Sequence, residues 1–477
     1  MDRIPTHAPG LDAVLHGGLP ANSTLLISGV PGSGKTTLAT QILFGNATPE
    51  RRGLFISTVS EPQSRLLRYV QQYAFFQAEK VNTAIHFEDL GIHLLEKNGD
   101  TALRRIEELV LQYQPAFLVV DSFRSLVDLS EHLAATRRGI FHLAASLAAL
   151  SCTTLLVGEY CREDIPHTVE STIVDGILLL ENTMHEQRDL RGLRVIKLRG
   201  SAYEAGEHSC KITAQGMQIF PRFRTPAAPQ TYTVQRERAR VGIPGFDDVL
   251  LPGGLLRGTV TLTSGDPGVG KTVTALHYLL NGARAGETGA YITFQENPSQ
   301  LARIAQNFGF DFEGLQKRGR LHLMYKSPVE LDLDEHAYAI LHVLEESRAR
   351  RVVIDSISDL EASARRGPDR FFDFIYSLSE WLKSRGITAL LTTEMGQIFS
   401  GSLTLTGRGI SHIADNILLL RYAEVEGEIR RALTMLSARG SDHNKAVFEY
   451  LISEEEGPRL GKPLRSAFNL FQETTHR

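Results

Sequence analysis

The chain has 477 residues, of which 42% are hydrophobic and 22% are charged. Because an average domain has roughly 150 residues, this length predicts more than one hydrophobic core, and two large domains fit best. The 51 basic and 55 acidic residues give a formal net charge of only -4, so no strong positive field toward nucleic acid is expected.

The amino terminus and the cysteines indicate a cytoplasmic protein. The first segment, MDRIPTHAPG, lacks the pattern of a signal peptide, and no uncharged apolar run approaches the roughly 18 residues that span a bilayer. The three cysteines include no C-x-x-C pair, which argues against a disulfide scaffold and a zinc ribbon. We therefore expect a reducing compartment and no contact with a membrane.

Short apolar strands and helices alternate along the first half of the chain. A strand before residue 29 leads into a glycine-rich loop and a helix, and the strand GLFIST follows at 53–58. A helix after Pro62 precedes the strand FLVVDS at 117–122, which is apolar on both faces, as in a parallel sheet covered by helices. Further strands are predicted at 154–158, 176–180 and 193–197.

The second half repeats this order at a period of about 236 residues, the separation of Lys35 from Lys271. PGLDAVLHGGLP and TLLISGVPGSGKTT in the first copy correspond to PGFDDVLLPGGLL and VTLTSGDPGVGKTV in the second. RVVIDS at 351–356 matches FLVVDS, and strands are predicted at 389–393, 416–420 and 431–436. The pattern predicts an α/β protein with two tandem domains, each with a mainly parallel central sheet flanked by helices.

The segment between the copies, PRFRTPAAPQTYTVQRERAR, carries several prolines and mixed charge. Such a composition suits an extended connection rather than a packed element. We predict a first domain at 1–225, a linker at 226–240 and a second domain at 241–477.

Each copy carries the motif G-x-x-x-x-G-K-[ST] between an apolar strand and a helix, the setting that this phosphate-binding loop requires. Its glycines let backbone N–H groups approach phosphate oxygens, its lysine reaches the β- and γ-phosphates, and its hydroxyl binds Mg²⁺. The sequence therefore predicts that both domains bind ATP. The predicted ATP-binding residues are Gly29, Gly32, Ser33, Gly34, Lys35, Thr36 and Thr37 in the first copy and Gly265, Gly268, Val269, Gly270, Lys271, Thr272 and Val273 in the second.

Asp121 and Asp355 end the second apolar strand of each copy, where a carboxylate can hold the Mg²⁺ shell through water. Each could also cap the helix that follows, and the two roles are compatible. The histidines show no metal-like spacing, so no metal beyond Mg²⁺ is expected. The predicted Mg²⁺ residues are Thr36, Asp121, Thr272 and Asp355.

With these motifs in this order, and with the late strand KLRGS at 197–201, the chain resembles the KaiC family from about residue 3 to about residue 470. SHIADNILLLRY, GEIRRALTML and ARGSDHNKAVFEYLI make the second half the closer match. The resemblance implies two tandem RecA-like P-loop domains and a double-ring homohexamer with ATP at each subunit interface. It also implies the serine and threonine self-phosphorylation that several members carry out.

The resemblance implies a pair of glutamates after the strand that follows the P-loop helix, one of which polarises the attacking water or hydroxyl. Val59 and Ser60 stand at these positions in the first domain, with Glu61 one residue out of register, so we expect that domain to hydrolyse ATP poorly. The second domain has Gln295, which can orient a water but cannot accept its proton, and it keeps one glutamate, Glu296. Glu296 could instead be a surface carboxylate or one that stabilises the start of the next helix. We expect slow hydrolysis in the second domain. The predicted catalytic residues are Glu296, Gln295, Lys271 and Lys35.

In KaiC-like rings a K-x-R-G-[ST] strand reaches the neighbouring subunit's γ-phosphate like an arginine finger. Lys197 and Arg199 match both cations in the first domain, whereas the second domain retains Arg439 but has Ser437 in place of the lysine. Lys445 also matches the family pattern. The two arginines could instead pair with surface carboxylates. The first domain thus keeps its fingers and lacks the glutamates, while the second keeps a glutamate and lacks a finger.

We expect a nucleotide-dependent hexameric ring with a signalling or regulatory role and an unidentified protein partner. The family's phosphorylated Ser-Thr pair falls on Ser411 and His412, and Thr406 matches a third hydroxyl of that region, so self-phosphorylation is expected to be weak or absent. Ser411 could equally be a turn or cap residue. The chain ends with FNLFQETTHR, without the longer tail of the clock member, so a circadian role is not expected.

Two other classes stay open. A RecA- or RadA-like DNA-dependent ATPase could use the basic stretch ARRGPDR at 364–370 as a channel loop, although the near-neutral charge and the lack of a zinc-finger cysteine cluster argue against it. A non-catalytic scaffold would use ATP only to set assembly. Binding of single-stranded DNA at low salt would indicate the first class, and ATP-dependent assembly without turnover would indicate the second.

Overall fold

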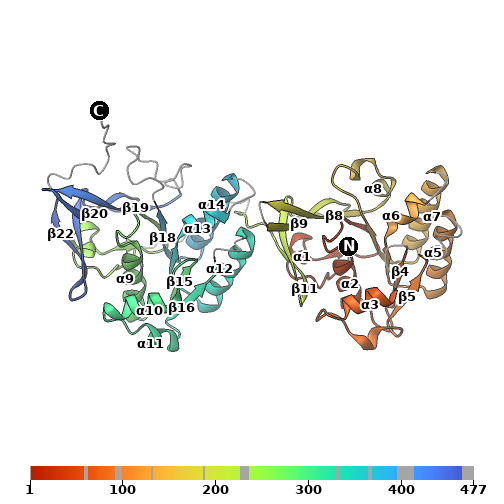
Figure 1. Cartoon of the computed structure of the whole chain (residues 1–477), viewed down its shortest axis with the longest axis horizontal. Helices are drawn as coiled ribbons and strands as arrows, with labels where there is room; N and C mark the ends of the chain where they lie inside the picture. Colours follow the sequence, from red (N-terminus) through yellow and green to blue (C-terminus); the bar gives the residue numbers. More distant parts are fainter. Residues whose placement is uncertain are drawn as a thin grey trace. The chain divides into compact units, whose positions relative to one another are not determined.

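The computed structural model describes residues 2–58, 63–91, 99–129, 133–185, 188–225, 236–327, 332–363, 368–394 and 413–464. The chain forms two compact units, Met1–Arg222 and Phe223–Arg477, which we call the first and the second domain. In each of them a central sheet carries helices (Figure 1).

The first domain begins with a short hairpin and continues as alternating strands and helices. Its elements are β1 (Arg3–Ile4), α1 (Leu11–Val14), β2 (Leu19–Pro20), β3 (Thr24–Gly29), α2 (Lys35–Asn46), β4 (Gly53–Ser57), α3 (Gln63–Val70), η1 (Ala78–Lys80), β5 (Ile85–Asp89), α5 (Gly99–Tyr113), β6 (Phe117–Asp121), α6 (Phe123–Asp128), α7 (Leu133–Ala149), β7 (Thr153–Gly158), η2 (Ile165–His167), α8 (Val169–Ile173), β8 (Gly176–His185), β9 (Arg188–Leu198), β10 (Glu207–Thr213) and β11 (Gly216–Phe220).

A nine-stranded sheet, in the order β11-β10-β9-β8-β3-β7-β6-β4-β5, forms the centre of this domain. The strands from β8 to β5 are parallel, whereas β8, β9, β10 and β11 pair antiparallel. Strand β3 lies between its parallel neighbours β7 and β8, at the centre of the nine-stranded sheet, so the loop that follows it emerges at the carboxyl edge of the parallel strands. Ligands of open α/β sheets bind at this edge.

The second domain repeats the same order. Its elements are β12 (Arg238–Ala239), η3 (Phe246–Leu250), β13 (Leu255–Leu256), β14 (Val260–Gly265), α9 (Lys271–Arg284), β15 (Gly289–Thr293), α10 (Pro298–Asn307), α11 (Phe312–Lys317), β16 (Leu321–Tyr325), α12 (Leu333–Ser347), β17 (Arg351–Asp355), α13 (Ile357–Ser363), α14 (Pro368–Ser384), β18 (Thr388–Glu394), β19 (Asn416–Val425), β20 (Glu428–Ala438), β21 (Phe448–Ser453) and β22 (Gly457–Pro463). Its sheet has the order β16-β15-β17-β18-β14-β19-β20-β21-β22.

Both faces of each sheet are covered, which explains why the central strands are continuously apolar. In the first domain, Val119 of β6 belongs to the core on the α2 side, with Leu43, while its neighbour Leu118 belongs to the core on the α5 and α7 side, with Ile106. Successive residues of a strand point to opposite faces, so each sheet is buried between two helical layers. The predicted fold class is confirmed: two tandem RecA-like domains with mainly parallel sheets.

Helix α14 of the second domain carries the only tryptophan of the chain, Trp381. Its ring is partly buried against the core, and the guanidinium of Arg385 lies 5.4 Å from the ring centroid. None of the helices in the described ranges is long and apolar enough to cross a membrane.

Candidate functional site

The first glycine-rich loop connects β3 to α2. Gly32 and Gly34 have positive φ angles of 75° and 99°, which glycine adopts without the steric cost of a side chain. Gly34 has a second reason to be glycine, because a Cβ atom there would lie 2.5 Å from Met217 Cε and 2.7 Å from Ile212 Cδ1. Side chains of the β10 and β11 hairpin therefore pack directly against the loop, and only glycine fits at position 34.

The second loop, between β14 and α9, has the same conformation. Gly268 and Gly270 have φ angles of 72° and 111°. A Cβ atom on Gly270 would lie 2.6 Å from Ile452 Cδ1 and 3.0 Å from Tyr450 Cε1, both on β21. Two stretches of chain with different side chains thus build the same loop, each supported by a strand from the antiparallel part of its own sheet.

The loop lysines are buried. Lys35 Nζ donates to the carbonyl oxygen of Val30 at 3.0 Å, and Lys271 Nζ donates to the carbonyl oxygens of Gly265 and Asp266, both at 2.9 Å. Burial lowers the pKa of both ammonium groups, and neighbouring carboxylates, Glu159 first in one domain and Glu394 first in the other, oppose this shift. A phosphate would favour the charged ammonium further, because an opposite charge raises the pKa of a lysine.

A hydroxyl and a carboxylate meet beside each loop. Thr36 Oγ1 donates to Asp121 Oδ2 at 2.6 Å, and Thr272 Oγ1 donates to Asp355 Oδ2 at 2.9 Å. These oxygen atoms fit Mg²⁺, which usually takes one or two protein ligands and completes its shell with water and phosphate oxygens. The described residues contain no group of three or more His, Cys, Asp or Glu that could hold a metal ion by itself.

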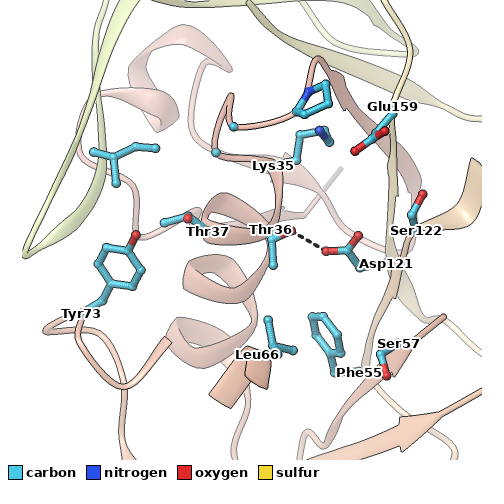
Figure 2. A pocket seen from close by; sticks show the side chains of 14 residues that line it. Lys35, Thr36, Thr37, Phe55, Ser57, Leu66, Tyr73, Asp121, Ser122 and Glu159 are labelled. Atoms are coloured by element: carbon cyan, nitrogen blue, oxygen red, sulfur yellow. Dashed lines mark hydrogen bonds between the residues drawn. The ribbon is translucent and has the colours of Figure 1, made fainter. Parts of the chain in front are cut away.

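A cavity of about 460 Å³ opens over the first loop. Lys35 and Glu159 point into it at one end, and the bonded pair Thr36 and Asp121 lies across it (Figure 2). Tyr73 lies beside Thr37 in its wall (Figure 2), and Ile212 lines the cavity as well. Of the predicted ATP-binding residues, Gly32, Gly34, Lys35, Thr36 and Thr37 line this cavity, while Gly29 and Ser33 are buried behind the loop.

A cavity of about 270 Å³ occupies the same place in the second domain. Predicted residues that line it are Gly268, Gly270, Lys271, Thr272, Val273, Gln295, Glu296 and Asp355, whereas Gly265 and Val269 are buried behind the loop. Ser356, Asp359 and Glu394 line it as well. The structure thus brings both candidate catalytic residues of this domain to its loop lysine and its candidate metal carboxylate.

The turn between β15 and α10 places Gln295 and Glu296. The Glu296 N–H donates to Thr293 Oγ1 at 3.1 Å, and Asn297 caps α10 by accepting from the Ser299 N–H at 2.9 Å. Burial raises the pKa of the Glu296 carboxyl, and the charge of Asp355 raises it further. A carboxyl whose pKa is raised in this way is a candidate for proton transfer.

The predicted cations of the subunit interface do not line the cavity of their own domain. Lys197 Nζ donates to the carbonyl oxygen of Val174 at 2.6 Å, and Arg199 lies exposed, 3.7 Å from Asp175. Arg439 and Lys445 are exposed on the segment between β20 and β21. Lys197 and Arg199 lie at the end of β9, Arg439 follows β20 at the place that matches Arg199, and Lys445 lies a few residues further on.

Several predicted residues lie outside the described ranges. These are Val59, Ser60 and Glu61 of the first domain, the candidate phosphorylation sites Thr406 and Ser411, and residues 364–367 of the basic stretch.

The structure adds cavity residues that the motifs did not predict. Glu159 directly follows β7 and Glu394 ends β18, the strands beside the P-loop strands, and the two residues occupy equivalent positions of the two copies. Aligning the copies would have found this pair, because both are acidic residues after an apolar strand. Asp359 has no counterpart in the first copy, where Ser125 stands, so the repeat gives no sign of it.

Each domain thus combines a parallel sheet, a glycine-rich loop before a helix, a buried lysine and a threonine–aspartate pair, which together define a RecA-like P-loop nucleotide-binding domain. Residues 4–224 and again 239–463 match the protein family described as "ATPase: KaiC". The chain belongs to this family, and ATP binding follows from it.

Curated relatives match nearly the whole chain. "Circadian clock oscillator protein KaiC" of Rippkaea orientalis is 30% identical over 475 residues, which cover 97% of this chain and 89% of the relative. The protein of that name from Thermostichus vulcanus is 30% identical over 487 residues, with 98% and 90% covered. The one from Synechococcus elongatus is 28% identical over 475 residues, with 97% and 90% covered.

Proposed function

We propose that this protein is a nucleotide-gated ring in which the second domain slowly hydrolyses Mg·ATP while the first domain chiefly binds ATP to hold subunits together. The observation that carries the proposal is the cavity of the second domain, where Gln295 and Glu296 join Lys271, Thr272 and Asp355. The family match supports an ATPase in general, whereas the difference between the two sites is inferred from the residues of this chain.

Hydrolysis requires a water oxygen to bond to the γ-phosphorus while the bond to the β,γ-bridging oxygen breaks. Mg²⁺ bound with ATP neutralises charge on the β- and γ-phosphates. Lys271 binds those phosphates, Thr272 and Asp355 hold the metal shell, and Gln295 orients the water. Glu296 is the carboxylate that can accept its proton, because burial makes this group a stronger base than an exposed glutamate.

We assign the first domain to assembly because its residues at the two glutamate positions are Val59 and Ser60. Its loop lysine, threonine and aspartate still line a cavity. Arg199 and Lys197, and in the second domain Arg439 and Lys445, are proposed to reach the nucleotide of a neighbouring subunit in a homohexamer. Their place away from their own cavities supports that proposal, since a side chain acting within its own domain would line its cavity.

Self-phosphorylation is proposed to be weak or absent, because Gln295 cannot accept a proton from a hydroxyl and position 412 is His412 instead of the family's threonine. The ring is proposed to report its nucleotide state to a protein partner. Phosphopeptide mapping after incubation with ATP tests whether self-phosphorylation is weak or absent, and strong labelling at Ser411 or Thr406 would contradict that proposal.

The two-site proposal is tested by ATP turnover of Lys35→Ala, Lys271→Ala and Glu296→Gln proteins together with the particle mass with and without Mg·ATP. Lys271→Ala and Glu296→Gln are expected to abolish most turnover, and Lys35→Ala is expected to reduce the hexamer fraction. Turnover that survives Lys271→Ala but collapses with Lys35→Ala would reverse the assignment. Zero turnover with ATP-dependent assembly would identify a scaffold instead.

A further inference from the structure

A buried carboxylate that the proposed mechanism does not use lies beside Gln295. Asp359 is 7% exposed, and it accepts three hydrogen bonds. One of its oxygens accepts from Gln295 Nε2, and the other accepts from the Ser356 N–H at 3.3 Å and from Ser356 Oγ at 2.9 Å. A carboxylate this buried requires such partners.

The contact fixes which way the amide of Gln295 points. An ionised carboxylate only accepts hydrogen bonds, so the NH₂ end of the amide must face Asp359 and the oxygen must face away from it. Gln295 itself is exposed at the cavity beside Lys271 and Thr272. Its Oε1 is therefore left as a hydrogen-bond acceptor for another partner.

The two copies of the chain support this pairing. The first domain has Val59 where the second has Gln295, and it has Ser125 where the second has Asp359. The carboxylate thus occurs in the copy that has an amide to orient.

We propose that Asp359 is a positioning residue for hydrolysis in the second domain, holding Gln295 so that its Oε1 accepts a hydrogen bond from the attacking water. This inference rests on the proposed function of that domain. An unrestrained glutamine would present its NH₂ end to the water about as often as its oxygen, and a donor cannot orient the lone pair of a water that must attack phosphorus. The carboxylate removes that alternative.

A simpler role for Asp359 is structural. Ser356 precedes α13 and Asp359 is the third residue of that helix, so the bond from the Ser356 N–H to the carboxylate is one half of a capping box. The cap uses one carboxylate oxygen and Gln295 the other. The two roles therefore separate if changes at position 295 compensate changes at position 359, because residue 295 takes no part in the cap.

The experiment measures kcat and KM for ATP in the full chain, the affinity for a fluorescent ATP analogue without Mg²⁺, and the melting temperature. Asp359→Ala is expected to lower kcat about 10- to 100-fold while the Mg²⁺-free affinity stays within about twofold, since loss of a positioning contact costs rate more than binding. Glu361→Ala, an exposed carboxylate on the same helix, is the matched control and should leave kcat unchanged.

Asp359→Asn covers the case in which the alanine variant fails to fold. If the oxygen of the introduced amide accepts from Ser356, its NH₂ group faces the NH₂ group of Gln295. The Gln295 amide then turns by 180° and presents its NH₂ group to the water. Asp359→Asn should therefore also lower kcat. Retention of kcat within about twofold by Asp359→Asn, or by a folded Asp359→Ala, would overturn the proposal.

The decisive comparison adds Gln295→Glu. Alone, it puts a second carboxylate against Asp359, and like charges at that distance disfavour ionisation of both, so kcat should fall about tenfold. In the Asp359→Ala background the same change should raise kcat at least about tenfold over Asp359→Ala, although the cap is still missing. Equal effects of Gln295→Glu in both backgrounds would show that Asp359 serves only the cap.

A Lys271→Ala background separates this inference from the function on which it rests. There Asp359→Ala should cause no further loss of turnover. If Lys271→Ala leaves turnover unchanged, the proposed function fails whatever residue 359 does. If Lys271→Ala abolishes turnover but the variants at 359 do not lower it, only the positioning role is wrong.

Discussion

Asp355 and Asp121 end matching strands of the two domains, yet their carboxylates have different neighbours. Besides its threonine, Asp355 accepts hydrogen bonds from the fully buried Tyr291 at 2.6 Å and from Thr392. The matching residues of the first domain are Phe55 and Val157, which have no hydroxyl. Because partners behind a metal ligand orient it, the same motif is expected to hold Mg²⁺ more firmly in the second domain.

The two domains also differ at the amino-terminal ends of their parallel strands. In the second domain Glu287 joins Arg351 and Arg257 through hydrogen bonds of 2.9 Å, and Arg351 is 3% exposed. The first domain has Arg51 and Phe117 at the positions of Glu287 and Arg351, with the guanidinium 4.9 Å from the ring centroid. The two copies thus share the nucleotide loop, but the second has an ion-pair network where the first has a cation–π contact.

The largest expected effect concerns the candidate metal carboxylates of the two domains. Asp355→Asn should lower ATP turnover about 1000-fold, since a Mg²⁺ ion supplies several kcal/mol of transition-state stabilisation. Asp121→Asn should lower it less than about threefold when rates are measured on particles of equal mass. Equal losses in the two variants would mean that both domains hydrolyse ATP.

Next is the ion-pair network. Glu287→Gln should destabilise the second domain by about 3 kcal/mol, because it leaves the buried guanidinium of Arg351 without its carboxylate. Arg51→Ala in the first domain should cost about 0.5–1 kcal/mol, the value of a partly exposed cation–π contact. Urea unfolding of both variants measures the difference, and a larger loss for Arg51→Ala would contradict it.

The same network predicts acid sensitivity. Burial raises the pKa of Glu287, but the hydrogen bonds and charges of Arg351 and Arg257 outweigh it and bring the pKa to about 2. A carboxyl with a lowered pKa stabilises the fold above its unfolded value of about 4.3 and loses that contribution as the pH falls toward its folded value. Between pH 6 and pH 3 the wild type should therefore lose more stability than Glu287→Gln.

A smaller effect concerns Tyr291. Burial and the charge of Asp355 raise the pKa of this tyrosine well above its usual value, so it remains a hydrogen-bond donor. Tyr291→Phe should raise the Mg²⁺ concentration for half-maximal turnover about tenfold. The control is Tyr278→Phe, a buried tyrosine that donates to the carbonyl oxygen of Thr388 and should leave the Mg²⁺ requirement unchanged.

The smallest expected effect comes from changing the first domain toward the second. Phe55→Tyr with Val157→Thr gives the first domain the two hydroxyls of the second. In a Lys271→Ala background this double variant should tighten Mg²⁺-dependent binding of a fluorescent ATP analogue about threefold, less than the loss at Tyr291 because the surrounding core is packed for apolar side chains. Unchanged binding would show that these hydroxyls do not determine the difference.

The sequence predicted the fold class, which is confirmed. It also singled out Lys271 from the loop motif, Asp355 from the end of an apolar strand, and Gln295 and Glu296 from the family resemblance. These four residues line one cavity, because the loop and the ends of parallel strands meet at a common edge of the sheet. The roles of these residues, and those of Lys197, Arg199, Arg439 and Lys445, stay predictions.

The partners of Asp355 could not be predicted from the sequence. Tyr291 and Thr392 lie on β15 and β18, which flank β17 only in the folded sheet order. Whether their side chains meet Asp355 depends on strand register, and a shift of one residue would turn each to the opposite face. Asp359 is similar, because its bond to Gln295 joins a turn and a helix that are 64 residues apart.

Trp381 lies in the second domain, and the first contains no tryptophan. Indole fluorescence excited at the red edge of the aromatic band therefore reports on the second domain alone, without a label or a truncated chain. Compared with circular dichroism, which sees both copies, this emission resolves whether ATP stabilises one half of the molecule before the other.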